Sequence, residues 1–247
     1  MAALGFNKCT KEHGVYTRGE GQKRVVLGVY VDDLIITGTD QGEVNTFKEE
    51  MKETFKMSDL GCLRYYLGIE VNQQPGWITL SQAAYAAKLL EKFGMTSCNS
   101  VQVPMENRLK LSKISTTPPV DASWYRSIVG SLQYLVHTRP DIASSIGYVS
   151  RFMEKPTTEH LSVVKHILRY IAGTLHYGLS FTKGNGEIEL KGYSDADMAG
   201  DVDDWKSTTD VMFCLGNAPV TWQSQKQPVV ALSSCEVEYI AASSTAC

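Results

Sequence analysis

The sequence predicts an α+β fold in which short strands at both ends of the chain flank a helical middle. Runs of about four to eight β-branched and apolar residues, separated by turn residues, occur before residue 81 and again after residue 186. Between residues 121 and 180, apolar side chains recur at helical spacing. The 247 residues and 43% hydrophobic content are ordinary for a globular chain of one large domain or a few small ones.

Composition excludes several classes of protein. No apolar run approaches the roughly 18 to 20 residues of a membrane span, and the first residues have neither the basic region nor the apolar core of a signal peptide. The six cysteines include no CxxC pair, which indicates reduced thiols. We therefore expect an intracellular protein, in the cytoplasm or the nucleus, that is not secreted and has no membrane partner.

Charge is unevenly distributed along the chain, although the net charge of −3 does not itself indicate a nucleic-acid binder. Between Arg151 and Lys191 there are six basic residues against four acidic ones, whereas the stretch from Asp195 to Asp210 has six aspartates against one lysine. A basic stretch beside an acidic one suits phosphate contacts next to a metal site. Ordinary surface variation explains the same pattern, so both interpretations stay open.

The first predicted element is a β-hairpin made of residues 25–31 and 34–37, with Asp32-Asp33 at its tip. A carboxylate pair on a turn is often no more than a solvated turn. Held on a stiff hairpin, the same pair can bind divalent ions that activate a primer hydroxyl and stabilise departing pyrophosphate. Mg²⁺ prefers such oxygen ligands.

A helix over residues 41–56 is predicted next. Asp40 precedes Glu43 by three residues, a spacing typical of a capping box. The apolar face of this helix contains Val44, Phe47, Met51 and Phe55.

A second hairpin is predicted from residues 63–71 and 77–80, which flank a turn containing Pro and Gly. Ser81 is a suitable cap for a following helix whose inward face contains Tyr85, Leu89 and Phe93. Residues 94–120 are rich in Pro, Ser, Thr and Asn and predict a linker with little structure of its own.

Three helices and a second group of strands complete the predicted elements. The first helix carries Tyr125, the second begins at Pro140, and the third follows Thr157. The strands are expected at residues 187–193, 211–215 and 219–223. A last helix begins near Ser233 and continues to Cys247 without a cap, which we interpret as truncation.

These motifs, in this order, resemble the Pol polyprotein of copia-type LTR retrotransposons. Residues 27–38 (LGVYVDDLIITG) resemble the catalytic hairpin of its reverse transcriptase. Residues 57–61 (MSDLG) and 65–71 (YYLGIEV) resemble the strand pair that grips the primer end, and residues 138–142 (TRPDI) are a further family phrase. The resemblance extends along essentially the whole chain.

The resemblance implies a partial reverse-transcriptase palm and thumb, a helical connection and a truncated ribonuclease H-like α/β sheet. Residues 1–80 would be the C-terminal half of the palm with both hairpins, and residues 81–120 the thumb and linker. Residues 121–180 would be the connection, and residues 181–247 the N-terminal half of the ribonuclease H-like domain.

A second chemical site is implied by residues 192–197 (GYSDAD), which follow a strand, and 233–241 (SSCEVEYIA), which open a helix. Spacing alone makes this a weak signal, because two distant acids are usually unrelated. By resemblance to ribonuclease H, Asp195 is the strand carboxylate and Glu238 the helix carboxylate, in a site where two metals are held by clustered acids.

The implied catalytic and metal-binding residues are therefore Asp32, Asp33, Asp195 and Glu238. The implied primer-grip residues are Tyr66, Leu67 and Gly68. Four basic residues fit contacts along a hybrid backbone and a solvated helix face equally well, namely Lys88, Lys92, Arg108 and Lys110.

Both implied sites lack members. The family's polymerase site has a third aspartate upstream, but residues 1–31 contain no Asp, and the remaining ribonuclease H acids would follow Cys247. We expect a fragment of an RNA-directed DNA polymerase with ribonuclease H that is inactive alone. Its parent would use Mg²⁺ or Mn²⁺, an RNA template, RNA–DNA hybrid and dNTP. The alternatives are a non-catalytic, host-retained hybrid-binding or interaction module and one segment of a longer active polyprotein.

Overall fold

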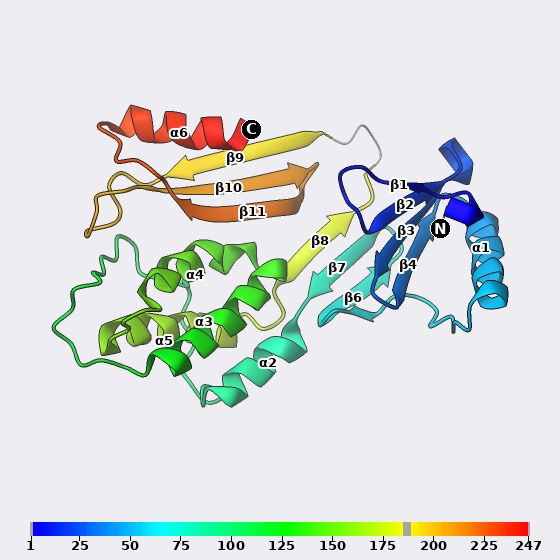
Figure 1. Cartoon of the computed structure of the whole chain (residues 1–247). Helices are drawn as coiled ribbons and strands as arrows, with labels where there is room; N and C mark the ends of the chain where they lie inside the picture. Colours follow the sequence, from blue (N-terminus) through cyan, green and yellow to red (C-terminus); the bar gives the residue numbers. More distant parts are fainter. Residues whose placement is uncertain (1, 185–188, 247) are drawn as a thin grey trace. The chain divides into compact units, whose positions relative to one another are not determined.

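The chain has an α+β fold, and the computed structural model describes residues 2–184 and 189–246 (Figure 1). Its residues form two compact units, Met1–Leu63 and Arg64–Cys247. This boundary falls before the second predicted hairpin, whereas the sequence placed that hairpin with the first one. The assignment of four domains stays a prediction. No helix in the described part of the chain is both long and apolar enough to cross a membrane.

The first unit is a four-stranded antiparallel sheet with one long helix. The strands follow one another in the order β1 (Asn7–Lys8), β2 (Val15–Arg18), β3 (Val25–Tyr30) and β4 (Asp33–Gly38). Short 3₁₀ turns lie at Ala2–Leu4 and Gly21–Lys23. The sequence predicted β3 and β4 but not β1 and β2, because these two are short and carry polar residues at most positions.

Helix α1 (Gln41–Thr54) covers the sheet of the first unit. Its start was predicted correctly, because the Asp40 side chain accepts a hydrogen bond from the Glu43 N–H at 2.9 Å. Phe55, predicted on the buried face, is instead the exposed C-cap, since the helix ends before it. The unit's core contains Phe6, Val25, Leu27, Phe47 and Met51.

The second unit begins with a four-stranded antiparallel sheet in the order β5 (Tyr65–Tyr66), β6 (Ile69–Gln74), β7 (Trp77–Ser81) and β8 (Gly178–Thr182). The predicted second hairpin is therefore present as β6 and β7, but its predicted first strand, residues 63–71, is divided into β5 and β6 by a turn at Leu67-Gly68. The sequence did not predict β8, which pairs with β7 from almost a hundred residues further along the chain. Only the folded chain brings these two strands together.

Helix α2 (Ala83–Lys92) follows β7, but the prediction that Ser81 caps it is wrong. Ser81 is the last residue of β7, and the N-cap position is Gln82, whose side chain makes no capping bond. Glu70 on the neighbouring strand supplies the cap, because its Oε1 accepts from the Ala84 N–H at 2.8 Å. A cross-strand cap of this kind is invisible to local sequence patterns.

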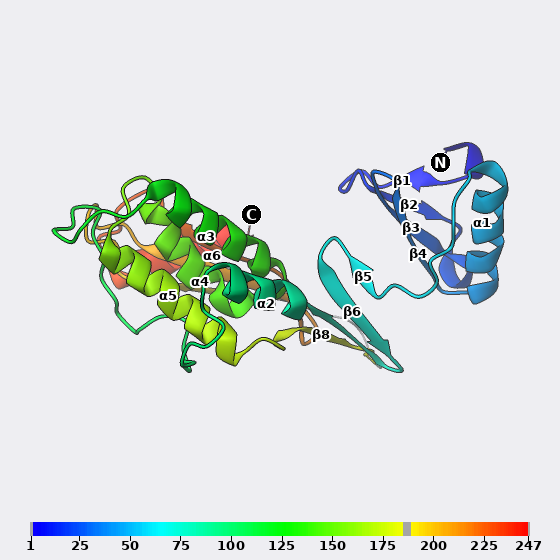
Figure 2. The ribbon, with the colours of Figure 1, turned by 90° about the horizontal axis from the view of Figure 1, so that it is seen from below.

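The helical layer consists of α2 with α3 (Ala122–Leu135), α4 (Ala143–Val149) and α5 (Thr158–Gly173), as Figure 2 shows. Three 3₁₀ turns, at Val136–Thr138, Pro140–Ile142 and Ser150–Phe152, join these helices. The predicted helix at Pro140 thus opens as a 3₁₀ turn. The layer shares one apolar core, whose fully buried members include Tyr125, Ile128, Leu132, Ile146 and Ile167.

One charged residue is buried in this layer. Arg139 is 1% exposed, and its guanidinium binds the Asp141 carboxylate in a bidentate arrangement. The guanidinium also donates a hydrogen bond to the Thr174 carbonyl at 2.9 Å. The interaction ties the end of α3 to the end of α5, so the TRPDI phrase has a structural role here. Residues 94–120 contain no helix or strand, as predicted, although Leu111 from this linker is buried in the core.

The last elements are a three-stranded antiparallel sheet and a helix. The strands β9 (Leu190–Ala196), β10 (Thr208–Leu215) and β11 (Ala218–Lys226) lie in the order β11-β10-β9, followed by α6 (Ser234–Ala246). Residues 187 and 188 of the first predicted strand lie outside the described residues. The three predicted strands are confirmed. β9 continues beyond its predicted end at residue 193, and β10 and β11 are each longer than predicted.

Helices α4 and α6 lie on opposite faces of this sheet (Figure 1). On one face, Ser144 of α4 donates to Asp210 at 3.0 Å. On the other, Gln227 donates both to Thr209 Oγ1 and to the Val237 carbonyl of α6. Because successive residues of a strand project to opposite faces, Asp210 and Thr209 mark the two sides.

Candidate functional site

The first candidate site is the turn between β3 and β4. Tyr30 pairs with Asp33, so the two-residue turn is Val31-Asp32 rather than the predicted Asp32-Asp33. Asp33 is the first residue of β4. Val31 has a φ of 52°, in the left-handed region that a β-branched side chain rarely adopts. The turn therefore places strain directly beside the two carboxylates.

Both carboxylates of this hairpin are free to bind a ligand. Asp32 and Asp33 are exposed, and neither accepts a hydrogen bond or forms an ion pair within the described part of the chain. The strand that leads to them is anchored by Val25 and Leu27, which are buried in the core of the first unit. A rigid base with exposed oxygen donors is suited to a hard divalent cation.

Glu12 lies at the same end of this sheet, a placement that the sequence did not indicate. Val15 pairs with Gly28, and the Val29 N–H donates to the Gly14 carbonyl at 2.7 Å, so the turn before β2 lies beside the end of β3. The Glu12 carboxylate accepts a hydrogen bond from the Gly14 N–H at 3.0 Å. Among residues 2–184 and 189–246, no three His, Cys, Asp or Glu side chains form a group that could hold a metal ion. The oxygen donors of Asp32 and Asp33 are of the kind that Mg²⁺ prefers.

The predicted primer-grip residues form a turn in the second unit. Tyr66 ends β5, Ile69 begins β6, and Leu67-Gly68 connects them as a two-residue loop. Both loop residues have positive φ, 48° for Leu67 and 76° for Gly68. The turn is exposed, and it is the second place where a non-glycine residue is held in the left-handed region at a hairpin of expected function.

The second candidate site contains Asp195 on β9 and Glu238 on α6, both exposed. Asp195 pairs with Asp210, so its side chain projects from the face on which α4 lies. Glu238 belongs to the helix on the other face. The structure therefore does not gather these two carboxylates into a cluster of metal ligands.

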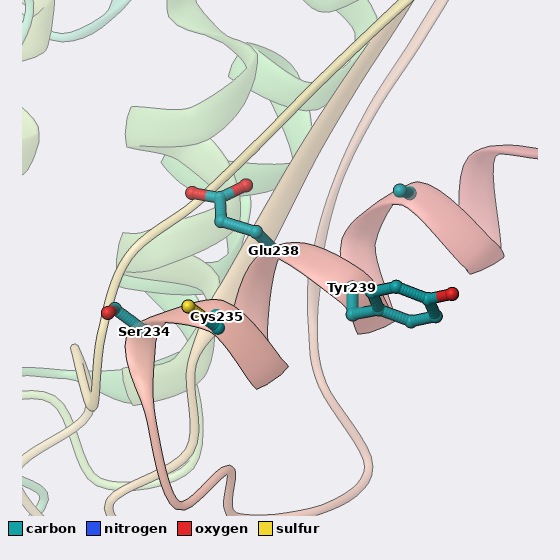
Figure 3. Close-up of a pocket in the computed structure, with 5 residues that line it drawn as sticks. Ser234, Cys235, Glu238 and Tyr239 are labelled. Carbon is teal, nitrogen blue, oxygen red and sulfur yellow. The ribbon is translucent and has the colours of Figure 1, made fainter.

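Glu238 lines an open hollow of about 500 Å³ on the flank of α6 (Figure 3). The other lining residues are Ser234, Cys235, Tyr239 and Ala242. In Figure 3, the Glu238 and Tyr239 side chains point away from each other. The neighbouring acids Asp197 and Glu236 are used locally, because Asp197 accepts the Thr208 N–H at 2.6 Å and Glu236 accepts the Leu232 N–H at 2.7 Å.

The aspartates that follow Asp195 accept hydrogen bonds or form ion pairs within the fold. Asp201 is 5% exposed and pairs with Lys226, which also contacts Asp204 at 2.8 Å. Arg151 lies 3.6 Å from Asp201. Burial by itself raises the pKa of Asp201, but hydrogen bonds from Lys226 and from the Asp203 N–H lower it below its ordinary value on balance. These carboxylates stabilise the loop rather than lie open to a metal.

The same loop binds the linker between α2 and α3. Asp203 accepts hydrogen bonds from Ser112 Oγ and from the Lys113 N–H at 2.8 Å. Lys110 donates to the Gly200 carbonyl at 2.9 Å. No local sequence feature indicates this contact, because it joins residues about ninety positions apart.

The four basic candidates differ in their surroundings. Lys88 and Arg108 are exposed and make no hydrogen bond or ion pair within the described residues, whereas Lys92 donates to Ser127 at 3.4 Å and Lys110 is held by the loop. A nucleic-acid role for any of them stays a prediction. Of the four side chains, Lys88 and Arg108 are the more available for a phosphate contact.

Comparison with known proteins gives a consistent result. Residues 1–107 match the model of the family described as reverse transcriptase (RNA-dependent DNA polymerase). The chain is 41% identical over 245 residues to the retrovirus-related Pol polyprotein from transposon RE1 of Arabidopsis thaliana, and 43% identical over 230 residues to that from transposon TNT 1-94 of Nicotiana tabacum. These alignments cover 99% and 90% of this chain but 17% of each polyprotein.

A third relative is comparable to this chain in length. The putative transposon Ty5-1 protein of Saccharomyces cerevisiae is 34% identical over 248 residues, which cover 99% of this chain and 80% of that protein. No solved structure gives a significant match.

Proposed function

Because this chain belongs to the copia-type retrotransposon Pol family, we propose that it contributes the catalytic hairpin and primer-binding elements of an RNA-directed DNA polymerase. The observation that carries the proposal is the Val31-Asp32 turn, where two carboxylates without partners in the described residues stand on a buried strand within the matched reverse transcriptase region. Partners of the complete enzyme would be an RNA template, an RNA–DNA hybrid and dNTP.

The reaction proposed for the parent enzyme is attack of a primer 3′ hydroxyl on the dNTP α-phosphorus, with release of pyrophosphate. Reverse transcriptases use divalent metal, Mg²⁺ or Mn²⁺, which lowers the charge barrier to this in-line displacement. Asp32 and Asp33 would supply carboxylate oxygens for it. The residues of the Leu67-Gly68 turn would bind the primer strand and limit its motion.

We further propose that the chain does not extend primers or cut RNA by itself. No aspartate precedes Asp32 in the chain, and Glu12, which lies at that end of the sheet, uses its carboxylate on the Gly14 N–H. Asp195 and Glu238 arise on opposite sides of the C-terminal sheet. Phosphoryl transfer depends on positioned charge, so an incomplete ligand set should reduce the rate severely.

Primer extension on an RNA template with Mg²⁺ tests both statements. We expect no extension by the chain alone, and extension when an upstream Pol segment carrying the missing aspartate is added. The double variant Asp32→Asn/Asp33→Asn should abolish the reconstituted activity. The double variant Glu53→Gln/Glu154→Gln, which removes the same charge from two exposed acids outside the site, should retain it. Extension by the chain alone would contradict the proposed inactivity.

A second candidate function is a non-catalytic module that binds RNA–DNA hybrid. The exposed charges of Lys88 and Arg108, which have no partners within the described residues, favour it. Binding through phosphates would weaken as salt rises, with each lost phosphate contact lowering the slope of log K against log salt by about 0.9. Lys88→Gln/Arg108→Gln should then reduce that slope. Hybrid binding with no activity in the reconstituted enzyme would favour this candidate.

A further inference from the structure

The Leu67-Gly68 turn has a conformation that needs external support. Positive φ at both central residues is the pattern of a type I′ hairpin turn. Glycine adopts this region freely, but leucine does not, because its Cβ approaches the following carbonyl. A strained residue of this kind persists only where its surroundings hold it in place.

Tyr134 of α3 provides that support. Its hydroxyl donates a hydrogen bond to the Leu67 carbonyl, a contact between residues far apart in the sequence. A Cβ added at Gly68 would lie 2.7 Å from the same hydroxyl oxygen, so any other residue there would displace the Tyr134 hydroxyl. The Tyr134 ring is itself held edge-on by Tyr85 at 5.1 Å and by His137 at 5.6 Å.

The hydrogen bond fixes the direction of one peptide group. In a planar trans peptide, the Leu67 C=O and the Gly68 N–H point in opposite directions. With the carbonyl directed at α3, the Gly68 N–H is directed away from the helical layer. Rotation of this peptide would convert the turn from type I′ to type II′ and reverse both groups, and it would require the Tyr134 bond to break.

The outward side of the turn is available to a ligand. Leu67 is 43% exposed and Tyr65 is 63% exposed, so core packing does not explain the strain. Within the described residues, the N–H groups of Leu67 and Gly68 donate to no acceptor. Two successive free N–H groups on a turn are suited to an anion, here a phosphate oxygen.

We infer that Tyr134 is a positioning residue that locks this turn with its main-chain N–H groups directed at a backbone phosphate of the primer strand. The inference rests on the proposed function for the partner, but the lock itself is a property of the fold. It makes α3, in the segment expected to be the connection, part of the primer-holding element.

Hybrid binding by the full chain, followed by fluorescence anisotropy across a salt series, tests the role. Tyr134→Phe removes only the hydroxyl. We expect the Kd for the hybrid to rise about fivefold, the equivalent of one net hydrogen bond. We also expect the slope of log K against log salt, the salt slope, to fall in magnitude by about 0.9, the value for one phosphate contact. Tyr177→Phe, which removes a hydroxyl that makes no hydrogen bond within the described residues, should change neither.

A purely structural role for Tyr134 would lower stability without lowering the salt slope. An unchanged slope in Tyr134→Phe, with hybrid bound normally by the unaltered chain, overturns the inference and leaves the proposed function in place. Failure of the unaltered chain to bind hybrid overturns both.

A double-mutant cycle tests the lock without any ligand. Asparagine tolerates the left-handed region, so Gly68→Asn should destabilise mainly through the contact with the Tyr134 hydroxyl. Without that oxygen, the nearest ring atoms lie at 3.4 and 3.5 Å, which is ordinary contact. We therefore expect Gly68→Asn to lower the Tm by several degrees and Tyr134→Phe to restore part of it. Strictly additive effects would show that the two residues do not meet, and would overturn the lock.

Discussion

The two acid-bearing regions of this chain resemble each other in sequence and differ in structure. At the Val31-Asp32 turn, Asp32 and Asp33 are exposed and have no partners within the described residues. In the stretch from Asp195 to Asp210, Asp201, Asp203 and Asp204 accept hydrogen bonds or form ion pairs within the second unit. The comparison shows that acid density is a poor guide to a metal site. The hydrogen-bond partners of each carboxylate decide which acids are available to a ligand.

The largest expected effect comes from removing a partner in the acidic loop. Lys226→Met would leave Arg151, at 3.6 Å, as the remaining basic partner of buried Asp201 among the described residues. Breaking a buried pair completely costs about 3–5 kcal/mol, so losing one of two cations should lower the free energy of unfolding by about 2 kcal/mol. Denaturant titration followed by tryptophan fluorescence measures this. Lys191→Met on the same sheet removes an exposed pair with Glu189 and should cost less than about 0.5 kcal/mol. Equal losses in the two variants would contradict the comparison.

Acid should weaken the same loop. Because the pKa of Asp201 is lower in the folded chain than its ordinary value of 3.8, its contribution to stability is present above that value and is lost as pH falls through the folded pKa. Asp204 shifts in the same direction, chiefly because of its hydrogen bond from Lys226. The hydrogen-exchange protection factors of residues 199–206 and 110–113, measured relative to the intrinsic exchange rate at each pH, should therefore fall at acid pH. In Asp201→Asn this pH dependence should be reduced, and an undiminished dependence would assign it to other groups.

The hairpin turn should respond in the opposite direction. Val31→Gly removes the strain of a β-branched residue at positive φ, and we expect a gain of about 1 kcal/mol after allowing for glycine's greater unfolded freedom. The first unit contains no tryptophan. Slower hydrogen exchange of residues 25–38 is therefore the appropriate measurement. Faster exchange would show that Val31 makes a stabilising contact. In the reconstituted polymerase, loss of activity with this gain would link the strain to function.

The smallest expected effect is that of neutralising the hairpin acids. Asp32→Asn/Asp33→Asn should change the free energy of unfolding by no more than about 0.5 kcal/mol, because the carboxylates have no partners to lose in the described residues. The same exchange measurement over residues 25–38 records it. A loss above about 1 kcal/mol would mean that these acids, like those of the loop, stabilise the fold.

Local patterns were sufficient for many elements of the fold. The β3–β4 hairpin, the cap at Asp40, and helices α3 and α5 all follow from alternation, helical spacing or capping residues that act over a few positions. The predicted turn was shifted by one residue, because composition alone does not set the register between Tyr30 and Asp33. Strand β8 was missed, because its pairing partner lies far away in the sequence.

The sequence by itself determined the family, the α+β order of elements, and the presence of Asp32-Asp33 on a hairpin, because these depend on neighbouring residues. Only the tertiary structure decided that Glu70 caps α2, that Tyr134 holds the Leu67 carbonyl, and that Lys226 neutralises Asp201. Each of these contacts joins residues that are distant along the chain. These contacts form only when the packed elements bring donors and acceptors together, so local sequence patterns do not predict them.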